Sequence, residues 1–299
     1  MNLRFDKQVA LITGAGKGLG RAYALWLAAR GASVVVNNRV RPGAASSAQA
    51  VVEEITRAGG IALADEHAVE SEAGAASMVE AAFSRFGRLD ILICNAAISE
   101  NVAFQEASLE HIRELLNVNL WGTIYVVHAA LPRMLAARYG RVVLTTSQAG
   151  LYGQTGGTSY ACSKSAMIGL ARGIARDVGD VDVKINTIAP AAYTPMSQKD
   201  VDARWSEFMS PFKVAPVVGW LCSSACNTSG LILNVGAGRI RRAKVMEGAA
   251  VEIKNEDVAA CWPALDDMSN AVEAKSSFDS GMVLMPELFA ADTAMIDKR

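Results

Sequence analysis

Short apolar runs alternate with helical patterns along the first 235 residues of the chain. Seven runs bounded by turn residues indicate buried strands, at residues 9–13, 33–37, 61–64, 89–94, 141–146, 183–188 and 231–235. Helical patterns lie between them, at residues 21–30, 45–58, 73–86, 109–134 and 159–178. Strands that alternate with helices and are apolar along their whole length form a parallel sheet with helices on both faces. The sequence therefore predicts an α/β fold with a doubly wound parallel sheet of seven strands.

The last part of the chain departs from this alternation. Residues 239–242 are Arg-Ile-Arg-Arg, and residues 249–299 contain mixed helical segments without strand patterns. A segment of this length with few core residues is too small to bury an independent core. We expect one domain over residues 1–240 and a C-terminal extension, residues 241–299, that packs on this domain or on a partner subunit.

Composition and charge exclude several classes of function. Of the 299 residues, 51% are hydrophobic, which is enough for a large core, and the formal net charge is −1. The chain therefore has no basic field for nucleic acid or an anionic membrane, and no apolar run reaches the length of a membrane span. The first strand begins too near Met1 to leave room for a signal peptide, and five cysteines without paired spacing suit a reducing compartment. We therefore expect a cytoplasmic protein. Because the chain has only three histidines and they are scattered, we expect no metal site.

A glycine-rich segment, Thr13-Gly-Ala-Gly-Lys-Gly-Leu-Gly20, connects the first strand to the first helix. Glycine permits a tight turn and a close approach of the backbone to a pyrophosphate, while the N-terminus of the following helix offers free N–H groups and a favourable dipole. The segment predicts a Rossmann-type dinucleotide site. Its expected contacts are Gly14, Gly16, Lys17, Gly18, Leu19 and Gly20.

The end of the second strand bears on the choice between NAD and NADP. A carboxylate about 20 residues after the glycines would bind the ribose 2′-hydroxyl of NAD. This chain has Asn38 followed by Arg39, and Lys17 lies within the glycine segment. Each cation alone could be a solvated surface charge, but the two together, without a carboxylate, suit a 2′-phosphate. We expect NADP(H) to be favoured over NAD(H).

Tyr160 and Lys164 are four residues apart and therefore lie on one face of a predicted helix. Ser147 ends the fifth apolar run, 13 residues before Tyr160. A free phenol has a pKa of about 10, so proton exchange near neutral pH needs a lower pKa, which the charge of Lys164 would favour. A hydroxyl, a phenol and an ammonium beside a nucleotide site suggest proton transfer coupled to hydride transfer.

Taken together, the motifs resemble the classical short-chain dehydrogenases/reductases over about residues 5–240. They are Thr13-Gly-x-x-x-Gly-x-Gly20, Asn95-Ala-Ala97, Asn119, Ser147 and Tyr160-x-x-x-Lys164, in that family's order and spacing. The resemblance implies that Tyr160 is the general acid/base, that Ser147 binds the substrate oxygen and that Lys164 holds the nicotinamide ribose. For Asn119 it implies a catalytic role in keeping a water that relays protons to Lys164; a buried amide that ties helix to sheet is the alternative. Further implied cofactor contacts are Tyr160, Lys164, Asn38, Arg39, His67, Ala68, Asn95, Ala96, Pro190 and Thr194.

A narrower likeness is to the dehydrogenase unit of peroxisomal multifunctional enzymes, which oxidise (3R)-hydroxyacyl-CoA thioesters. It is carried by residues 18–24, 51–55, 186–190, 214–222 and 230–238. That unit usually has Asp at the position of Asn38 and uses NAD. His67 likewise stands where the family usually has an aspartate that contacts adenine. The chain therefore departs from this likeness at the adenosine end of the cofactor site.

These observations predict an NADP(H)-dependent oxidoreductase that interconverts a secondary alcohol and a ketone. The expected substrate is apolar: a 3-hydroxyacyl or 3-oxoacyl thioester, or an alicyclic or steroid ketone. The alternative is a non-catalytic NADP(H)-binding sensor or scaffold subunit. Residues 194–213 are a candidate lid, and five side chains could line the substrate cleft or belong to the core: Tyr152, Gln154, Tyr193, Met196 and Trp205. The expected partners are a small carbonyl or alcohol substrate and further copies of the chain, as a homo-dimer or homo-tetramer.

Overall fold

The computed structural model describes residues 3–40, 43–99, 101–199, 201–253, 257–274 and 276–284. The chain divides into two compact units, residues 1–242 and residues 243–299. Residues 285–299 of the expected extension lie outside the described residues.

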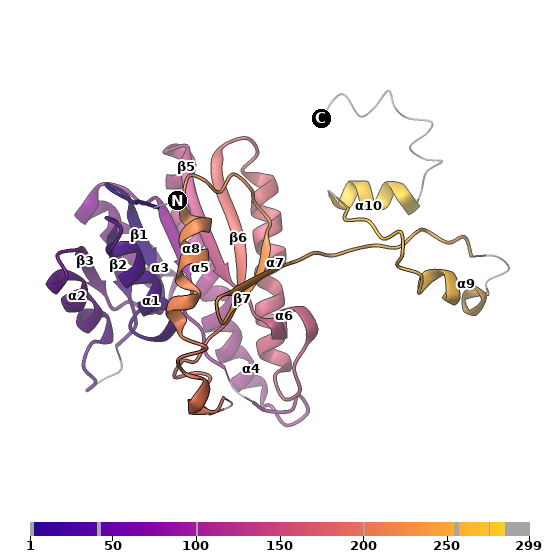
Figure 1. The fold of residues 1–299 in the computed structure, drawn as a ribbon, viewed down its shortest axis with the longest axis horizontal. Helices are drawn as coiled ribbons and strands as arrows, with labels where there is room; N and C mark the ends of the chain where they lie inside the picture. The colour runs from indigo at the N-terminus through magenta and orange to yellow at the C-terminus, as the bar shows by residue number, and fades with distance from the viewer. Residues whose placement is uncertain are drawn as a thin grey trace. The chain divides into compact units, whose positions relative to one another are not determined.

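An eight-stranded sheet forms the centre of the larger unit, in the order β3-β2-β1-β4-β5-β6-β7-β8 (Figure 1). Its strands are β1 Val9–Ile12, β2 Ser33–Asn37, β3 Ile61–Asp65, β4 Ile91–Cys94, β5 Tyr139–Thr145, β6 Asp182–Ala191, β7 Ile232–Gly236 and β8 Arg239–Ala243. The strands from β3 to β7 pair in parallel; in the register, Leu11 lies opposite Val35 on one side and opposite Leu92 on the other. The chain order reverses between β1 and β4, which creates the crevice where this architecture binds ligands.

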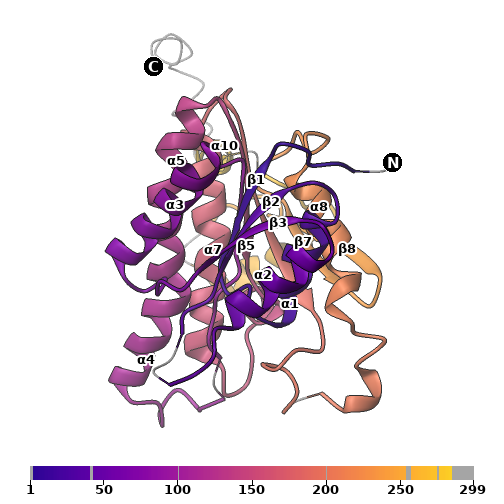
Figure 2. The same ribbon diagram turned by 90° about the vertical axis from the view of Figure 1, so that its left-hand side faces the viewer.

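Helices cover both faces of the sheet, as Figure 2 shows. One face carries α1 (Gly18–Ala28), α2 (Ser47–Arg57) and α8 (Ala215–Cys222), and the other carries α3 (Glu72–Phe86), α5 (Gly122–Ala136) and α7 (Thr158–Asp177). Successive strand side chains point to opposite faces, so Val34 and Val36 belong to one hydrophobic core and Val35 to the other. Fully apolar strands therefore form two cores, which confirms the doubly wound α/β fold expected from the sequence.

The sheet has one strand more than the seven expected. β7 and β8 are joined by Ala237 and Gly238, which both have positive φ angles, 50° and 74°. A two-residue connection of this kind reverses the chain into a hairpin, so β8 runs antiparallel to β7. β8 was not expected from the sequence because its residues 239–242 are all exposed and mostly arginine. Charged side chains on an edge strand discourage pairing with other chains, and they also remove the apolar signal of a strand.

The single helix expected over residues 109–134 is interrupted. α4 (Leu109–Leu116) passes into a π-helical turn, Asn117–Trp121, before α5 begins at Gly122. The amide N–H of Gly122 bonds the carbonyl of Asn117, five residues earlier. Such π turns are rare and often lie at functional sites. The apolar periodicity did not reveal the interruption because a wide turn adds only one residue to an otherwise helical pattern.

The smaller unit contains α9 (Val258–Leu265) and α10 (Ser277–Leu284). An isolated antiparallel bridge pairs Glu247 with Val272, and the ammonium of Lys244 lies 2.5 Å from a carboxylate oxygen of Glu273. Among the residues that the structure describes in this unit, Cys261 alone is buried. The described part of the unit therefore has almost no core of its own.

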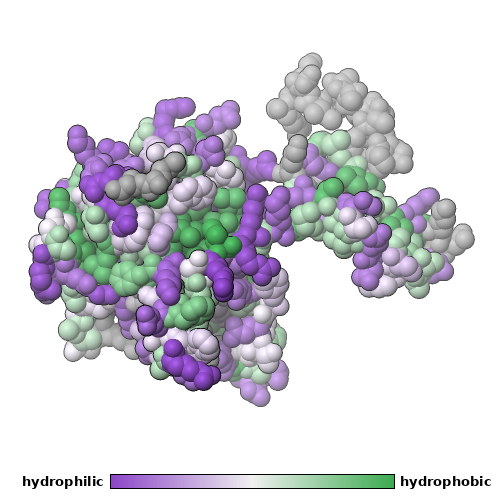
Figure 3. Space-filling view, viewed as in Figure 1, coloured by the Kyte–Doolittle hydropathy of each residue, from purple (hydrophilic) through white to green (hydrophobic). Residues whose placement is uncertain are grey.

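The visible surface of the larger unit mixes polar and apolar side chains, with an apolar area near its centre in the view of Figure 3. Trp220 of α8 and Ile240 of β8 are among the large apolar side chains exposed on this unit. In the described parts of the chain, we find no helix with the length and apolar character needed to span a membrane.

Candidate active site

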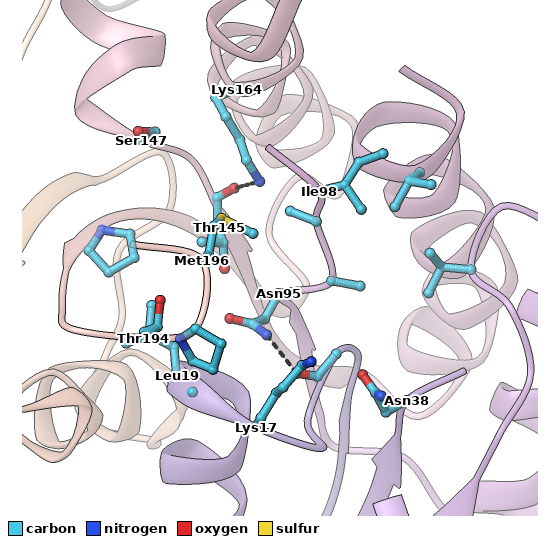
Figure 4. Close-up of a pocket in the computed structure, with 18 of the residues that line it drawn as sticks. Lys17, Leu19, Asn38, Asn95, Ile98, Thr145, Ser147, Lys164, Thr194 and Met196 are labelled. Atoms are coloured by element: carbon cyan, nitrogen blue, oxygen red, sulfur yellow. Dashed lines mark hydrogen bonds between the residues drawn. The ribbon is translucent and has the colours of Figure 1, made fainter. Parts of the chain in front are cut away.

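A cavity of about 330 Å³ opens at the carboxyl ends of the parallel strands. Its walls come from the segments that follow β1, β2, β3 and β4 and from the ends of β5 and β6. Figure 4 shows Ser147 and Lys164 toward one end of this cavity and Lys17 and Asn38 toward the other. Parallel pairing brings these strand ends to one edge of the sheet, and this is why residues so far apart in sequence share one cavity.

Ser147, Tyr160 and Lys164 lie together at the first end of the cavity. Ser147 follows β5 and caps the short helix α6 (Gln148–Tyr152), where its hydroxyl accepts a hydrogen bond of 3.1 Å from the amide of Ala149. The hydroxyl of Ser147 also interacts with the phenol of Tyr160 on α7, in the sense that lowers the pKa of the phenol. A serine and a tyrosine that line the same end of the cavity can both reach one oxygen atom of a bound molecule.

Lys164 is buried on the next turn of α7, and only 2% of its surface is exposed. Its ammonium donates a hydrogen bond of 2.9 Å to the carbonyl of Thr145, as Figure 4 shows. α6 packs tightly on α7 here, because a Cβ on Gly150 would lie 2.7 Å from the backbone of Lys164. This packing holds the lysine in one position at the floor of the cavity.

Burial changes the acidity of both groups. It lowers the pKa of Lys164 from 10.5 to about 8, because a low-polarity environment disfavours the ammonium. Burial also raises the pKa of Tyr160, and the hydrogen bond with Ser147 opposes the rise. The direction for Tyr160 is opposite to the lowered pKa expected from the sequence. The reason is that desolvation of the phenolate outweighs the favourable contacts made by the chain's own residues.

Asn119 lies in the π-helical turn behind this end of the cavity and is fully buried. Its amide oxygen accepts from the backbone N–H of Ile98 at 2.8 Å, and its amide nitrogen donates to the carbonyl of the same residue at 2.9 Å. The nitrogen also lies 3.2 Å from the hydroxyl of Ser163. Asn119 therefore ties the helix to the segment after β4, and it does not itself line the cavity.

The glycine-rich segment forms the central wall. Gly14 has a φ of 64°, and a Cβ there would lie 2.7 Å from Cα of Ala96. The amide of Asn95 donates to the carbonyls of Thr13 and Gly14, both at 3.1 Å. These bonds join the segment after β1 to the segment after β4. The backbone at Gly14 thus needs glycine both for its conformation and for its close approach to β4.

The second end of the cavity is lined by Lys17, Asn38, Arg39, His67 and Glu70. The side-chain amide of Asn38 donates to the hydroxyl of Ser47 at 2.8 Å. The guanidinium of Arg39 forms an ion pair with the carboxylate of Glu70.

His67 is oriented at this end by the buried Asp65. Nδ1 of the imidazole lies 2.9 Å from a carboxylate oxygen of Asp65, and the other oxygen of Asp65 accepts from the amide of Asn37 at 2.7 Å. The imidazole itself is about half exposed, with 52% of its side-chain surface accessible.

The residues of this cavity fit a nicotinamide dinucleotide. Lys17 is the N-cap of α1 and offers no side-chain hydrogen bond to the first turn, which also lacks acidic residues. The first amides of α1 are therefore available to an anionic pyrophosphate. Two buried oxygens of cavity residues also have no hydrogen-bond partner, the hydroxyl of Thr145 and one carboxylate oxygen of Glu70. Polar atoms buried without a partner are suited to meet the polar groups of a ligand.

Most of the residues expected at the site line the cavity: Gly14, Lys17, Gly18, Leu19, Asn38, Arg39, His67, Asn95, Ala96, Ser147, Tyr160, Lys164, Pro190 and Thr194. Four do not, namely Gly16, Gly20, Ala68 and Asn119. Gly16 and Gly20 support the loop from behind: a Cβ on Gly16 would lie 2.2 Å from the hydroxyl of Ser47, and one on Gly20 would lie 2.4 Å from the carbonyl of Gly14.

Of the five residues considered for a substrate cleft, Met196 lines the cavity and Tyr152, Gln154, Tyr193 and Trp205 do not. Tyr152 is 74% exposed and Trp205 is 46% exposed, so neither of these two belongs to the core either. Val69, Glu70, Ile98 and Thr145 also line the cavity and were not expected from the sequence, whereas Pro195 and Ser197, which line it too, belong to the candidate lid of residues 194–213. A signal existed for some of them, because Val69, Glu70 and Ile98 lie shortly after the ends of β3 and β4 and Thr145 is the last residue of β5, where ligands bind in such sheets.

Residues 8–205 match the family model of the short chain dehydrogenases. A Mycobacterium tuberculosis protein described as a short-chain type dehydrogenase/reductase is 37% identical over 88% of this chain and 96% of its own length. The peroxisomal multifunctional enzyme type 2 of Mus musculus is 36% identical over 97% of this chain, but the match covers only 41% of the mouse protein. The chain therefore spans less than half of that larger relative.

Solved structures agree with these relatives. The full-length peroxisomal multifunctional enzyme type 2 of Drosophila melanogaster has a TM-score of 0.81 and 31% identity, over 96% of this chain and 50% of the fly chain. A 7α-hydroxysteroid dehydrogenase in complex with NADH and 7-oxoglycochenodeoxycholic acid has a TM-score of 0.72 and 32% identity, over 79% of this chain and 96% of its own. The chain belongs to the short-chain dehydrogenase/reductase family and is an oxidoreductase of that type.

Proposed function

We propose that the protein interconverts a secondary alcohol and a ketone with NADP(H), and that Tyr160 is the general acid/base. One observation carries the proposal: Ser147, Tyr160 and Lys164 converge at one end of a cavity whose other end carries Lys17 and Arg39. Proton-transfer groups and phosphate-binding cations thus face the same space. This combination is suited to an oxidoreductase that uses a phosphorylated nicotinamide cofactor.

When bound in this cavity, a nicotinamide cofactor would supply or accept the hydride. In the direction of ketone reduction, Tyr160 donates a proton to the substrate oxygen, and in alcohol oxidation it removes the same proton. Ser147, which lines the same end of the cavity as Tyr160, donates to that oxygen and orients it. Lys164 holds the nicotinamide ribose and adds positive charge next to the phenol, which lies 5.7 Å from the ammonium when measured to the ring centre. This charge favours the tyrosinate that forms after proton donation.

The proposed preference for NADP(H) rests on charge at the adenosine end. Lys17 and Arg39 both line it, and the end of β2 carries the neutral Asn38 in place of a carboxylate. A guanidinium can bind phosphate with two parallel hydrogen bonds, and a carboxylate at position 38 would repel the phosphate. Leu19, Asn95, Ala96, Pro190 and Thr194 would contact the rest of the cofactor.

The proposed substrate is an apolar carbonyl or alcohol compound, either a 3-oxoacyl or 3-hydroxyacyl thioester or an alicyclic or steroid ketone. Ile98 and Met196 add an apolar lining near Lys164 (Figure 4), and Pro195 also lines the cavity. A neighbour of similar fold was solved with a bile-acid ketone, which supports the steroid class. Such a wall would bind the carbon skeleton of the substrate by burying it.

A panel of 3-oxoacyl thioesters and cyclic ketones, followed by loss of NADPH absorbance, tests this function. We expect turnover by the wild type and a loss of at least a thousandfold in kcat for Tyr160→Phe, because the general acid is removed while the ring remains. Tyr152→Phe is the matched control, since Tyr152 is 74% exposed and lies outside the cavity. Equal activity of Tyr160→Phe and the wild type would contradict the role proposed for Tyr160.

The alternative is a non-catalytic NADP(H)-binding sensor or scaffold subunit. It is favoured if NADPH binds with micromolar affinity while neither the wild type nor any variant turns over the panel. The buried ammonium and the paired phenol argue against it, because a pure binding site does not need an acid/base group at the nicotinamide end.

We also propose that the chain forms homo-oligomers and that residues 243–299 contribute to the assembly. The smaller unit exposes large apolar side chains, among them Trp262 at 64% and Leu284 at 71%. Sedimentation of the chain truncated after Arg242 tests this, and an unchanged assembly state would reject it.

A further inference from the structure

Glu70 is an acidic residue next to the proposed binding site of the 2′-phosphate, and the proposed preference for NADP(H) does not account for it. It follows β3, lines the adenosine end of the cavity and forms an ion pair with Arg39, the residue proposed to bind the 2′-phosphate. The two side chains are only partly accessible, 39% for Arg39 and 24% for Glu70. An ion pair with this degree of burial is less screened by water than a surface pair, so it competes with other ligands of the guanidinium.

The second oxygen of the same carboxylate has no partner. Oε1 of Glu70 faces Arg39, whereas Oε2 is buried and makes no hydrogen bond. A buried carboxylate oxygen without a donor destabilises the site until a ligand supplies one. A ribose hydroxyl is such a donor, and a phosphate dianion is not.

The neighbouring charged side chains do not supply the missing hydrogen-bond donor to Oε2 of Glu70. Among the residues that the structure describes, the charged and titratable side chains that face this end of the cavity are Lys17, Arg39, His67 and Glu70. His67 is already paired with Asp65, and Arg39 with Glu70. The second strand carries no acid at Asn38, so Glu70 is the acidic group that the described cavity presents to the adenosine ribose.

We propose that Glu70 is a specificity-determining residue, which holds Arg39 and thereby weakens the preference for NADP(H) over NAD(H). The inference rests on the proposed binding of the 2′-phosphate by Arg39. With NADP(H), the phosphate must displace the carboxylate from the guanidinium. With NAD(H), the 2′-hydroxyl donates to the free oxygen of Glu70 while the ion pair stays intact. Glu70 therefore supplies, from the segment after β3, the acceptor that the end of β2 lacks.

Dissociation constants of NADPH and NADH, measured by calorimetry on the full chain, test this inference without relying on turnover. In Glu70→Gln the shape of the side chain is kept but its charge is removed. We expect this variant to bind NADPH about tenfold more tightly and NADH two- to fivefold more weakly than the wild type. Glu66→Gln is the matched control, because Glu66 is an exposed acid on the same segment that does not line the cavity. Its two dissociation constants should stay within twofold of the wild-type values.

Two further variants, Arg39→Gln and the double variant Arg39→Gln/Glu70→Gln, test whether the effect of Glu70 on NADPH binding depends on Arg39. In an Arg39→Gln background, Glu70→Gln should change NADPH binding by less than twofold, because there is no guanidinium left to release. A tenfold gain in that background would overturn the inference, as would parallel changes for the two cofactors in Glu70→Gln alone. Melting temperatures of the wild type and the four variants identify any variant that has lost its fold. If Glu70→Gln is lost in this way, Glu70→Ala, which also removes the charge, replaces it with the same expected gain in NADPH binding.

The proposed preference for NADP(H) and the proposed role of Glu70 can be contradicted separately. A wild type that binds NADH more tightly than NADPH contradicts the proposed cofactor, yet an increase of the NADPH preference in Glu70→Gln still supports the role of Glu70. A wild type that prefers NADPH but whose Glu70→Gln variant keeps the same selectivity overturns the role of Glu70 and leaves the proposed cofactor intact.

Discussion

Replacing Lys164 by methionine is expected to stabilise the fold at neutral pH while it removes the ammonium from the proposed site. Lys164 is 2% exposed, and burial lowers its pKa from 10.5 to about 8. Each unit of pKa corresponds to about 1.4 kcal/mol, so the charged lysine destabilises the folded chain by roughly 3 kcal/mol below pH 8. Methionine has a similar length and no charge. It removes the donor to the buried carbonyl of Thr145, which costs about 1–3 kcal/mol, so a net gain of up to about 2 kcal/mol remains at pH 7.

The gain in stability from Lys164→Met should decrease as the pH rises above about 8. The folded pKa of Lys164 is lower than the unfolded one, so between these two values the unfolded chain binds more protons than the folded chain. The stability of the wild type therefore rises with pH from about 8 upward, whereas below pH 8 the penalty is constant. Between pH 8 and 9.5 the advantage of Lys164→Met should shrink by about 2 kcal/mol.

Urea unfolding of the two proteins at half-unit steps from pH 7 to 9.5 measures this difference. Tyr160→Phe is the control, because it alters the same helix and keeps Lys164. Its difference from the wild type should stay within about 0.5 kcal/mol of a constant value over this range, since the pKa of Tyr160 is raised by burial. A stability difference between Lys164→Met and the wild type that does not change with pH would refute the reasoning. So would a variant that is less stable than the wild type at pH 7.

Three further substitutions test parts of the framework by urea unfolding. Asn119→Leu should lower the free energy of unfolding by about 2–4 kcal/mol, because it leaves the buried backbone N–H and carbonyl of Ile98 without partners; a loss below 1 kcal/mol would contradict this. Gly14→Ala should lower it by at least about 1 kcal/mol and weaken NADPH binding, because the added Cβ would lie 2.7 Å from Cα of Ala96 at a φ of 64°. Arg141→Met should lower it by about 2–4 kcal/mol, because the fully buried guanidinium bonds three backbone carbonyls; wild-type stability would show that water satisfies them.

Much of the fold could be predicted because its signals are local. Val34, Val35 and Val36 are apolar whichever face they meet, and that continuity is the mark of a strand buried on both sides. The exceptions also have local causes. β8 is made of exposed arginines and so carries no apolar signal, and the π-helical turn at Asn119 differs from an α-helix by a single residue.

The candidate site was predictable where one segment alone carries the chemistry. The glycine segment and the pair Tyr160 and Lys164 owe their geometry to a turn and to one helical repeat. Residues whose role depends on a distant partner were not predictable in this way. Arg39 looked like a free phosphate ligand, whereas the structure pairs it with Glu70.

By itself, the sequence of this protein determined a doubly wound sheet, a glycine-rich loop after the first strand, and a phenol and an ammonium on one helical face. Backbone sterics and the spacing of apolar side chains act between near neighbours, so a linear sequence shows them directly. Only the tertiary structure decided that Lys164 is buried with a lowered pKa and that Asn119 secures the segment after β4. It also decided that Glu70 forms an ion pair with Arg39 and that one of its carboxylate oxygens has no hydrogen-bond partner. These properties arise from desolvation and from contacts between segments that meet only when the strand ends come together.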